Sequence, residues 1–396
     1  MQSQNPIFIP GPTNIPERIR LAMARPAWDH RTEAFEAFFG PLREDLKTVF
    51  GTEQGEVVLF TGSGTTGWDV ALSNLLAPGD RVLATSHGMF SQRWIDLARS
   101  LGLVVDVIEA EWGEGIPMDA MESALAEDTQ GAIKAVLAVH NETATGVTSD
   151  IGRVRQAMDQ QQHPALLFVD GVSSIGSLPF HMDDWGVDVA VSGSQKGFML
   201  PTGLAVVAIS ERAEQEAAAR THPRGHLDLG PMLKASRANS YPWTPAIGLI
   251  GALRESVDML MEEGLPAVYA RHTHLAGGVR AAAEAWGLPI CAKHPALYSD
   301  TVTAIHVPAP HSAAELVAHA NRRYGVSFGV GLGPLSDRVF RIGHLGQLTE
   351  TLLLSGLATA EMALLDLGVA IEPGSGVAAA QGHFRAVIAE SQEQIA

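Results

Sequence analysis

The chain of 396 residues is poor in cysteine and lysine, with one cysteine, Cys291, and five lysines. A single thiol excludes an internal disulfide framework and any zinc site built from several thiolates. The histidines, including His222 and His226, are not spaced as metal ligands are, so we expect no metal site. This cysteine usage fits the reducing cytosol.

Basic residues are fewer than acidic ones, and long apolar runs are missing. The chain has 27 lysines and arginines against 44 aspartates and glutamates, a formal net charge of -17 at pH 7. Nucleic-acid backbones bind to basic faces, so this charge argues against a nucleic-acid partner. No apolar run approaches the roughly 20 residues that span a membrane, and the first residues carry no export signal. We expect a cytoplasmic, globular protein without a membrane partner.

The sequence does contain apolar runs of strand type that end at polar edges. Residues 168–174 and 191–196 both pass abruptly from apolar residues to Gly and Ser, and the edges carry Asp170 and Lys196. A lysine and a carboxylate at neighbouring strand ends suit a pyridoxal phosphate site, where the lysine holds the cofactor and the acid pairs with its pyridinium nitrogen. The alternative is an aspartate that caps a turn and a lysine on the surface.

A glycine-rich turn separates the strand-like residues 56–60 from a helical pattern that ends at Pro78. Such a turn exposes backbone N–H groups at the positive end of the helix, an arrangement that binds phosphate. Gly62, Gly64 and Gly67 also satisfy the spacing G-x-G-x-x-G of dinucleotide-binding proteins. The next strand-like run ends without the acidic residue that would bind an adenosine ribose, so a dinucleotide is disfavoured. A tight turn without a ligand is a further alternative.

Strand-like and helical patterns alternate from about residue 56 to residue 209. This alternation predicts an α/β domain in which helices cover both faces of a mostly parallel sheet, with the reactive loops at one edge. A small α+β domain begins near Trp286 and ends with a helix over residues 352–367. We divide the chain into an N-terminal arm (1–15), a large three-layer domain (16–264) and a small C-terminal domain (265–396).

The N-terminal segment has too many prolines for a helix and too many apolar residues for a free tail, so we expect an ordered arm over residues 8–16. An amphipathic helix should begin within residues 29–33 at an acidic cap. His30 and Arg31 at this helix start either contact an anion or are simply solvated.

The motifs along the chain resemble those of the class V (fold type I) pyridoxal phosphate aminotransferases, in particular the serine-, alanine- and aspartate-glyoxylate aminotransferases. The resemblance runs in the family's order from near the N-terminus to Gly346, nearly the whole chain, and the combination of motifs is highly specific. The matching stretches are residues 11–16, 61–67, 78–80, 140–147, 169–174, 192–197, 241–245 and 339–346.

The resemblance implies a role for each matched residue. Lys196 matches the lysine that forms a Schiff base with the cofactor, and Asp170 matches the partner of the pyridinium nitrogen. Val172 and Phe90 would pack on the two faces of the cofactor ring, and Thr143 would reach its phenolic oxygen beside the substrate. The phosphate contacts match Ser63, Gly64, Thr65 and Gln195.

Further matches concern the substrate and the assembly. Arg341 matches the arginine that binds the substrate's α-carboxylate, and Gly11 would add a backbone contact. Tyr241 and Thr244 match residues that reach the cofactor phosphate of the partner subunit, which implies an obligate homodimer, alone or paired into a tetramer. Our hypothesis for the far end of the amino donor is a contact with Arg31.

The resemblance implies ping-pong transamination, in which a small L-amino acid passes its amino group to glyoxylate to give glycine. L-serine and L-aspartate, which would yield hydroxypyruvate and oxaloacetate, are favoured because Thr65 stands where the alanine-glyoxylate members carry histidine. The alternatives are an alanine-glyoxylate aminotransferase, a lyase or desulfurase of the same fold, and a non-catalytic regulator. A desulfurase would use a mobile loop cysteine, which Cys291 does not resemble.

Overall fold

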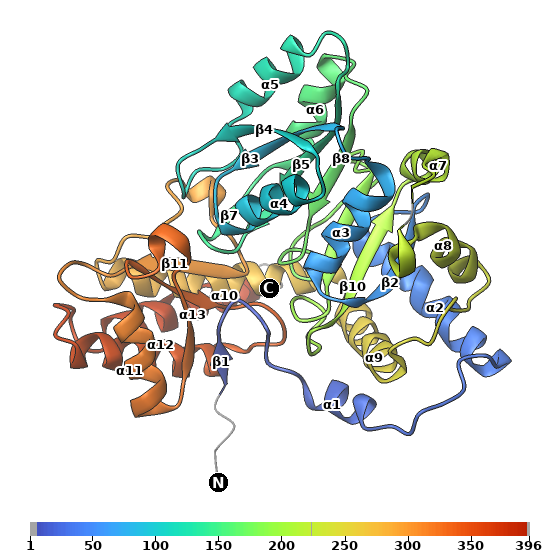
Figure 1. Ribbon diagram of the computed structural model, residues 1–396. Coiled ribbons are helices and arrows are strands. Elements are labelled where there is room, and N and C mark those ends of the chain that lie inside the picture. Colours follow the sequence, from blue (N-terminus) through green and yellow to red (C-terminus); the bar gives the residue numbers. More distant parts are fainter. Residues whose placement is uncertain (1–5, 223, 394–396) are drawn as a thin grey trace.

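The computed structural model describes residues 6–222 and 224–393, which form two larger β-sheets with helices packed against them (Figure 1). The larger, seven-stranded sheet has the order β2-β10-β9-β8-β5-β3-β4. β10 is antiparallel to both of its neighbours, and the other neighbouring strands are parallel, so the expected mostly parallel sheet is confirmed. Its strands are β2 Glu56–Gly62, β3 Arg81–Ser86, β4 Val104–Glu109, β5 Ile133–Val139, β8 Leu166–Asp170, β9 Val189–Gly193 and β10 Gly203–Ile209.

Successive side chains in these strands enter two separate hydrophobic layers. In β2, Val57 and Leu59 belong to one buried cluster, whereas Val58 and Phe60 belong to the other. Helices close both layers, which gives the expected three-layer α/β arrangement. The first layer is covered by α2 Glu33–Phe50, α5 Met118–Glu127, α6 Ile151–Gln160 and α9 Ile247–Glu263, and the second by α3 Gly64–Leu75, α4 Met89–Ser100, α7 Glu211–Ala219 and α8 Leu229–Arg237.

The second sheet has four strands in the order β1-β12-β13-β11 and a hydrophobic cluster of its own. β1 runs parallel to β12, whereas β13 is antiparallel to both β12 and β11. Its strands are β1 Ile7–Phe8, β11 Val302–His306, β12 Ser327–Val330 and β13 Val339–Gly343. Its helices are α10 Leu265–Ala285, α11 Ala313–Tyr324, α12 Glu350–Asp366 and α13 Ser375–Glu393, and elsewhere lie the short elements α1 Glu17–Met23, β6 Asn141–Glu142 and β7 Val147–Thr148.

The N-terminal arm is ordered, and its strand β1 is an edge strand of this smaller sheet, seen in Figure 1 as a blue segment beside the orange C-terminal elements. Phe8 is fully buried in the small hydrophobic cluster. The side chain of Asn14 accepts a hydrogen bond from the Ile7 N–H (2.9 Å) and donates one to the Ile7 carbonyl (2.8 Å). Asn14 therefore closes the arm into a loop anchored on the sheet.

Two sequence expectations about helices were wrong. The helix expected over residues 352–367 is α12, but it is not the last one, because α13 follows it and packs on α10 with Phe384 against Gly278. The cap of α2 is the hydroxyl of Thr32, which accepts from the Phe35 N–H, rather than an acid. The division of the chain at residue 264 stays a prediction. Within the described residues, no helix is both long and apolar enough to cross a membrane.

Candidate active site

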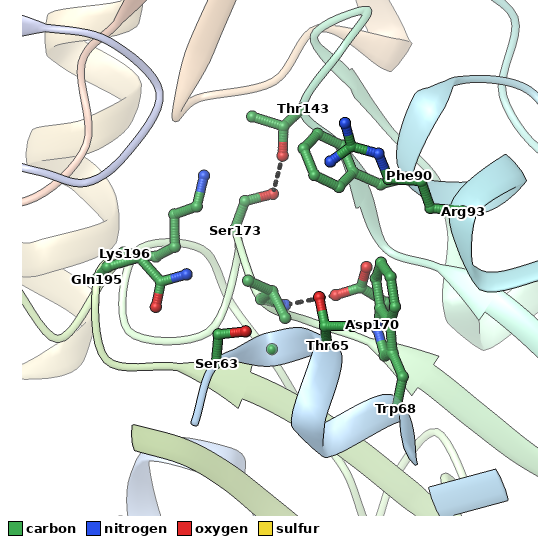
Figure 2. Close-up of a pocket in the computed structure, with 12 residues that line it drawn as sticks. Ser63, Thr65, Trp68, Phe90, Arg93, Thr143, Asp170, Ser173, Gln195 and Lys196 are labelled. Carbon is green, nitrogen blue, oxygen red and sulfur yellow. Dashed lines mark hydrogen bonds between the residues drawn. The ribbon is translucent and has the colours of Figure 1, made fainter. Parts of the chain in front are cut away.

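A pocket lies where β8 and β9 end and α3 begins (Figure 2). The expectation that the glycine-rich turn, Thr143, Asp170 and Lys196 share one edge of the sheet is met. Three further residues, which the sequence reasoning missed, also face this pocket. Its lining consists of Ser63, Gly64, Thr65, Trp68, Phe90, Arg93, Thr143, Asp170, Val172, Ser173, Gln195 and Lys196.

Asp170, the last residue of β8, is a buried carboxyl with few partners. Its Oδ1 accepts a hydrogen bond from the Val172 N–H at 2.8 Å, and no ion pair to it occurs within residues 6–222 and 224–393. Burial raises the pKa of Asp170 to about 7, against the lowering effect of the Val172 hydrogen bond and of Lys196. The charged form of such a buried carboxyl is stabilised when a cationic group of a ligand lies beside it.

Lys196 lies beyond the end of β9 and is also buried. Burial lowers the pKa of its amine to about 8, and the nearby charge of Arg341 lowers this pKa further, while Asp170 opposes the shift. Its Nζ donates a hydrogen bond to the Pro10 carbonyl of the arm. An amine with this pKa is partly neutral near pH 7 and can act as a nucleophile or a base.

The arm brings Gly11 against Lys196. A Cβ atom at position 11 would lie 2.6 Å from the Cδ and 2.7 Å from the Nζ of Lys196, and the φ of Gly11 is +117°, so only glycine fits. The Thr13 N–H donates to the Gln195 carbonyl at 3.1 Å, which fastens the arm to the loop that carries the lysine. Gly11 therefore lies directly against Lys196, one of the residues that line the pocket.

Arg341, on β13 of the smaller sheet, contacts Thr143, one of the residues that line the pocket. Its Nε donates to the Val330 carbonyl and its Nη1 to the Thr143 carbonyl, both at 2.9 Å. Burial lowers the pKa of Arg341 to about 10, with Glu142 raising it and Arg93 lowering it. The two bonds hold the guanidinium in place, and no partner of Nη2 occurs among the described residues.

The beginning of α3 provides a place for an anion. Ser63 is the N-cap of this helix, and Gly64 and Thr65 form its first turn, where backbone N–H groups have no partner within the helix. Gly64 lies so close to Val172 that a Cβ would come within 2.5 Å of a Val172 methyl group. Gln195 lines the same pocket, and the nitrogen of its side-chain amide can donate hydrogen bonds to an anion. These groups match a phosphate held at a helix N-terminus.

Thr143 is positioned by a small network of hydroxyl groups. Its Oγ1 donates to the Ser173 Oγ at 2.7 Å, and the Ser173 hydroxyl in turn donates to the Asn141 carbonyl at 2.9 Å. Asn141 Nδ2 donates back to the Ser173 Oγ at 2.8 Å. The loop after β5 is thereby tied to the loop after β8, with the Thr143 hydroxyl facing the pocket.

Phe90 stands over the pocket because a buried carboxylate holds the start of α4. Glu142 accepts hydrogen bonds from the N–H groups of Phe90 (3.0 Å), Ser91 (2.9 Å) and Ala144 (3.1 Å). A side chain at Gly88 would collide with this carboxylate, so the turn before α4 needs glycine. A negative charge at a helix N-terminus is also favoured by the helix dipole.

Five of the expected site residues do not line this pocket. Two of them, Gly11 and Arg341, contact residues that do, namely Lys196 and Thr143. The other three are Tyr241, Thr244 and Arg31. The Tyr241 hydroxyl donates to the Leu59 carbonyl, and its ring packs edge-on against Phe39 at 6.3 Å. Thr244 and Arg31 are exposed to solvent. One chain thus brings the expected residues together in this pocket or directly beside it, except for Tyr241, Thr244 and Arg31.

The three residues that the sequence reasoning missed each follow an expected residue at short spacing. Trp68 and Arg93 lie three residues after Thr65 and Phe90, on the same faces of α3 and α4, and Ser173 follows Val172 directly. Their spacing from the expected residues was the signal in the sequence that could have identified Trp68 and Arg93. The sequence did not show that these faces of α3 and α4 point into the cavity.

Comparisons with known proteins agree with this geometry. The family model described as aminotransferase class-V matches residues 21–332. The L-aspartate–glyoxylate aminotransferase of Paracoccus denitrificans is 54% identical over 396 residues, which cover 100% of both chains. The serine–glyoxylate aminotransferase of Methylorubrum extorquens is 51% identical over 387 residues, or 96% of each chain.

Among solved structures, the ureidoglycine-glyoxylate aminotransferase of Bacillus subtilis superposes with a TM-score of 0.90 at 27% identity and covers 96% of this chain and 97% of its own. The pyridoxamine-pyruvate aminotransferase of Mesorhizobium loti gives the same TM-score at 26% identity, with coverages of 98% and 99%. The family match spans well over half of the chain, and the two sequence relatives span nearly all of it. The chain belongs to the class V aminotransferase family and is an aminotransferase of fold type I.

Proposed function

We propose that this enzyme uses pyridoxal phosphate to move the amino group of a small L-amino acid, L-serine or L-aspartate, to glyoxylate, giving glycine and hydroxypyruvate or oxaloacetate. The observation that carries the proposal is a pocket lined by Lys196 and Asp170, with Arg341 held beside it on the Thr143 carbonyl. The choice of substrates is supported by relatives at 46–54% identity that are named as aspartate- and serine-glyoxylate aminotransferases.

The residues present fit pyridoxal phosphate. Asp170 offers a buried carboxyl that lacks a cation, which suits a pyridinium nitrogen, and Phe90 and Val172 offer apolar faces for the ring. Thr143 would contact the phenolic oxygen. When bound, this cofactor acts as an electron sink for the bonds of the substrate's Cα. The phosphate would be held by Ser63, Gly64, Thr65 and Gln195.

The chain's own residues then orient the substrate and move its proton. The planar guanidinium of Arg341 binds the α-carboxylate of either the amino acid or the keto acid, and the backbone of Gly11 adds a contact. This grip sets the Cα–H bond toward Lys196. In the first half of the cycle Nζ of Lys196 takes the proton from Cα, and in the second half it returns a proton to the carbon that becomes Cα of glycine.

The site is completed, in this proposal, by a second copy of the chain. Tyr241 and Thr244 would contact the cofactor phosphate of the partner subunit, which explains their place outside the pocket of their own chain. Arg31 would approach the same partner site. The assembly is therefore a homodimer, alone or paired into a tetramer, with active sites that neither chain forms alone.

A desulfurase reaction on this fold receives no support from the cysteine. Cys291 is buried, and it does not line the pocket. Burial raises the pKa of its thiol to about 11, with Arg338 and Lys293 only partly opposing the shift. A thiol of this kind stays protonated at neutral pH, whereas the reaction requires a reactive thiolate.

The test is the visible absorbance of the purified protein loaded with pyridoxal phosphate. The bound cofactor should give a visible absorption band. An amino donor should bleach this band, and glyoxylate added afterwards should restore it. Lys196→Ala should show no such band and lose at least about 10³-fold in turnover, because it lacks both the cofactor's anchor and the base. Lys234→Ala, which changes an exposed lysine on α8, is the matched control. Full turnover in Lys196→Ala would refute the proposal.

A further inference from the structure

Arg93 is a cation in the pocket that the proposed mechanism does not use. It lies on α4 one turn after Phe90, and its guanidinium carbon is 5.5 Å from the centre of the Phe90 ring (Figure 2). It lines the pocket together with Thr143, Asp170 and Lys196. Among the residues that the structure describes, no carboxylate forms an ion pair with it.

The neighbouring arginine on the same helix, Arg99, does not line the pocket. Arg99 points to solvent and has Asp96 at 3.9 Å. Arg93 is also exposed, but it lines the pocket, and its charge contributes to the lowered pKa of Arg341, whose guanidinium binds the Thr143 carbonyl beside the pocket. Two like charges directed at one cavity repel each other. A ligand that carries two negative groups would relieve this repulsion.

The cofactor phosphate does not account for Arg93. Figure 2 shows Ser63 and Thr65, the proposed phosphate contacts, at the lower end of the pocket, whereas the Arg93 guanidinium lies at the upper end with Phe90 and Thr143. Arg341 approaches the same upper end, because its Nη1 binds the Thr143 carbonyl. The two arginines therefore face the part of the pocket where the substrate binds.

We propose that Arg93 is a specificity-determining residue that binds the second carboxylate of a dicarboxylic amino donor, so that L-aspartate is preferred to L-serine and L-alanine. This inference rests on the proposed function and narrows its donor. Arg341 holds the α-carboxylate, and the guanidinium of Arg93 offers a planar pair of N–H donors to the side-chain carboxylate. Serine and alanine leave that cation without a partner, which lowers their binding relative to aspartate.

The acceptor half of the cycle uses only one of the two arginines. Glyoxylate carries one carboxylate, which Arg341 binds, and it has no group that could reach Arg93. The charge of Arg93 therefore acts in the donor half-reaction. Arg93 lines the pocket of its own chain, so we assign the far end of the donor to Arg93 in place of Arg31.

Kinetics of the donor half-reaction test this assignment. The ratio of kcat/KM for L-aspartate to that for L-alanine should fall roughly 100-fold in Arg93→Gln and by a smaller factor in Arg93→Lys, which keeps the charge but loses the planar fork. Arg99→Gln, which removes an equal charge from the solvent side of α4, should leave the ratio as it is. An unchanged ratio in Arg93→Gln would overturn the proposal, since a residue that only supports Phe90 affects all donors alike.

Equilibrium binding gives a readout that does not require turnover. Succinate has two carboxylates at the spacing found in aspartate, and propionate has one, and binding of each can be followed by calorimetry on the loaded enzyme. The wild-type protein should bind succinate more tightly than propionate, and Arg93→Gln should lose this preference. A preference retained in Arg93→Gln overturns the role of Arg93. A wild-type enzyme that shows the preference but never transfers an amino group to glyoxylate would instead refute the proposed function.

Discussion

Burial makes the amine of Lys196 usable near neutral pH. Its pKa is lowered from 10.5 to about 8 by burial and then by Arg341. The neutral amine, which is the nucleophile, thus dominates above pH 8 rather than above pH 10. The rate at which the apoprotein takes up pyridoxal phosphate should rise about tenfold per pH unit below 8 and level off above it. Stopped-flow measurement of the visible band across pH 6–10 checks this.

Arg341→Gln supplies the control for that profile. It removes the positive charge that disfavours a second cation, so the pKa of Lys196 should rise and the midpoint of the profile should move to higher pH. Because burial is the larger cause, the midpoint should stay below 10.5. A wild-type midpoint near 10 would show that Lys196 is not desolvated in the apoprotein.

The contrast between Lys196 and Arg93 shows what could be predicted at the scale of residues. Lys196 and Asp170 stand at the ends of apolar runs, in a chain with few lysines, so their chemistry was visible in the sequence. Arg93 is one of many arginines on helices, and most of those pair with carboxylates on the surface. Its place in the pocket lining depends on the rotation of α4, whose start is held by Glu142 of strand β6, about fifty residues away.

At the scale of elements, α4 depends on Glu142. The buried carboxylate accepts three backbone N–H groups, two of them at the start of α4. Glu142→Gln would turn an amide toward these donors and remove the charge at the helix N-terminus. We expect a loss of about 2 kcal/mol in the free energy of unfolding, measured by urea denaturation.

An exposed cap is the control for Glu142. Asp150 caps α6 by accepting from the Arg153 N–H at 3.1 Å, and it is exposed. Asp150→Asn should cost no more than about 0.5 kcal/mol, because asparagine is also a good N-cap and water solvates the site. Equal losses in the free energy of unfolding for Glu142→Gln and Asp150→Asn would mean that burial does not increase the contribution of Glu142 to stability.

The N-terminal arm is a second element whose position should affect catalysis. Asn14→Ala removes the two hydrogen bonds to Ile7 that close the arm, each worth about 1 kcal/mol. Gly11 would then be held less firmly beside Lys196, and kcat/KM for the amino donor should fall roughly tenfold. Steady-state assays measure this effect. A melting temperature that drops by more than about 8 °C would point to general destabilisation of the fold instead.

The sequence predicted the elements of the large sheet better than those at the two ends of the chain. Strands β5 and β8 are apolar apart from Lys134 near the start of β5 and Asp170 at the end of β8, as is typical of a strand buried on both faces. In contrast, α13 is rich in alanine and contains Gly376 and Gly382, so its apolar face is weak in the sequence. Its packing depends on α10, where Gly278 makes room for Phe384. The pairing of β1 with β12 joins residues about 320 positions apart, which no local pattern reveals.

At the scale of the whole molecule, the pocket draws on both sheets. Asp170 and Lys196, at strand ends of the large sheet, line it, while Arg341 of the small sheet binds the Thr143 carbonyl beside it and the arm places Gly11 against Lys196. One chain therefore holds the groups proposed for the proton transfer and for the α-carboxylate. It lacks, in its own pocket, the residue Thr244 that we assign to the phosphate of a partner. The proposed dimer predicts that this contribution crosses between chains.

Mixed dimers test that prediction. Lys196→Ala inactivates the site of its own chain, whereas Thr244→Asp would place a carboxylate against the cofactor phosphate of the partner, so each homodimer should be inactive. In a mixed dimer, the site with Lys196 receives an intact Thr244 from the other chain and should work. Coexpression at equal levels should therefore recover roughly a quarter of wild-type activity, because half of the dimers are mixed and each contains one intact site.

The same experiment separates a shared site from one formed within a single chain. If Thr244 served the site of its own chain, a mixed dimer would contain one site without Lys196 and one damaged by Thr244→Asp, and no activity would return. Light scattering on each preparation should give twice the mass of the 42.0 kDa chain, or four times this mass if the dimers pair. Unimpaired turnover in Thr244→Asp alone would exclude the phosphate contact itself. Activity recovered in the mixed dimers therefore requires that the chains form dimers and that Thr244 of each chain serves the active site of the other chain.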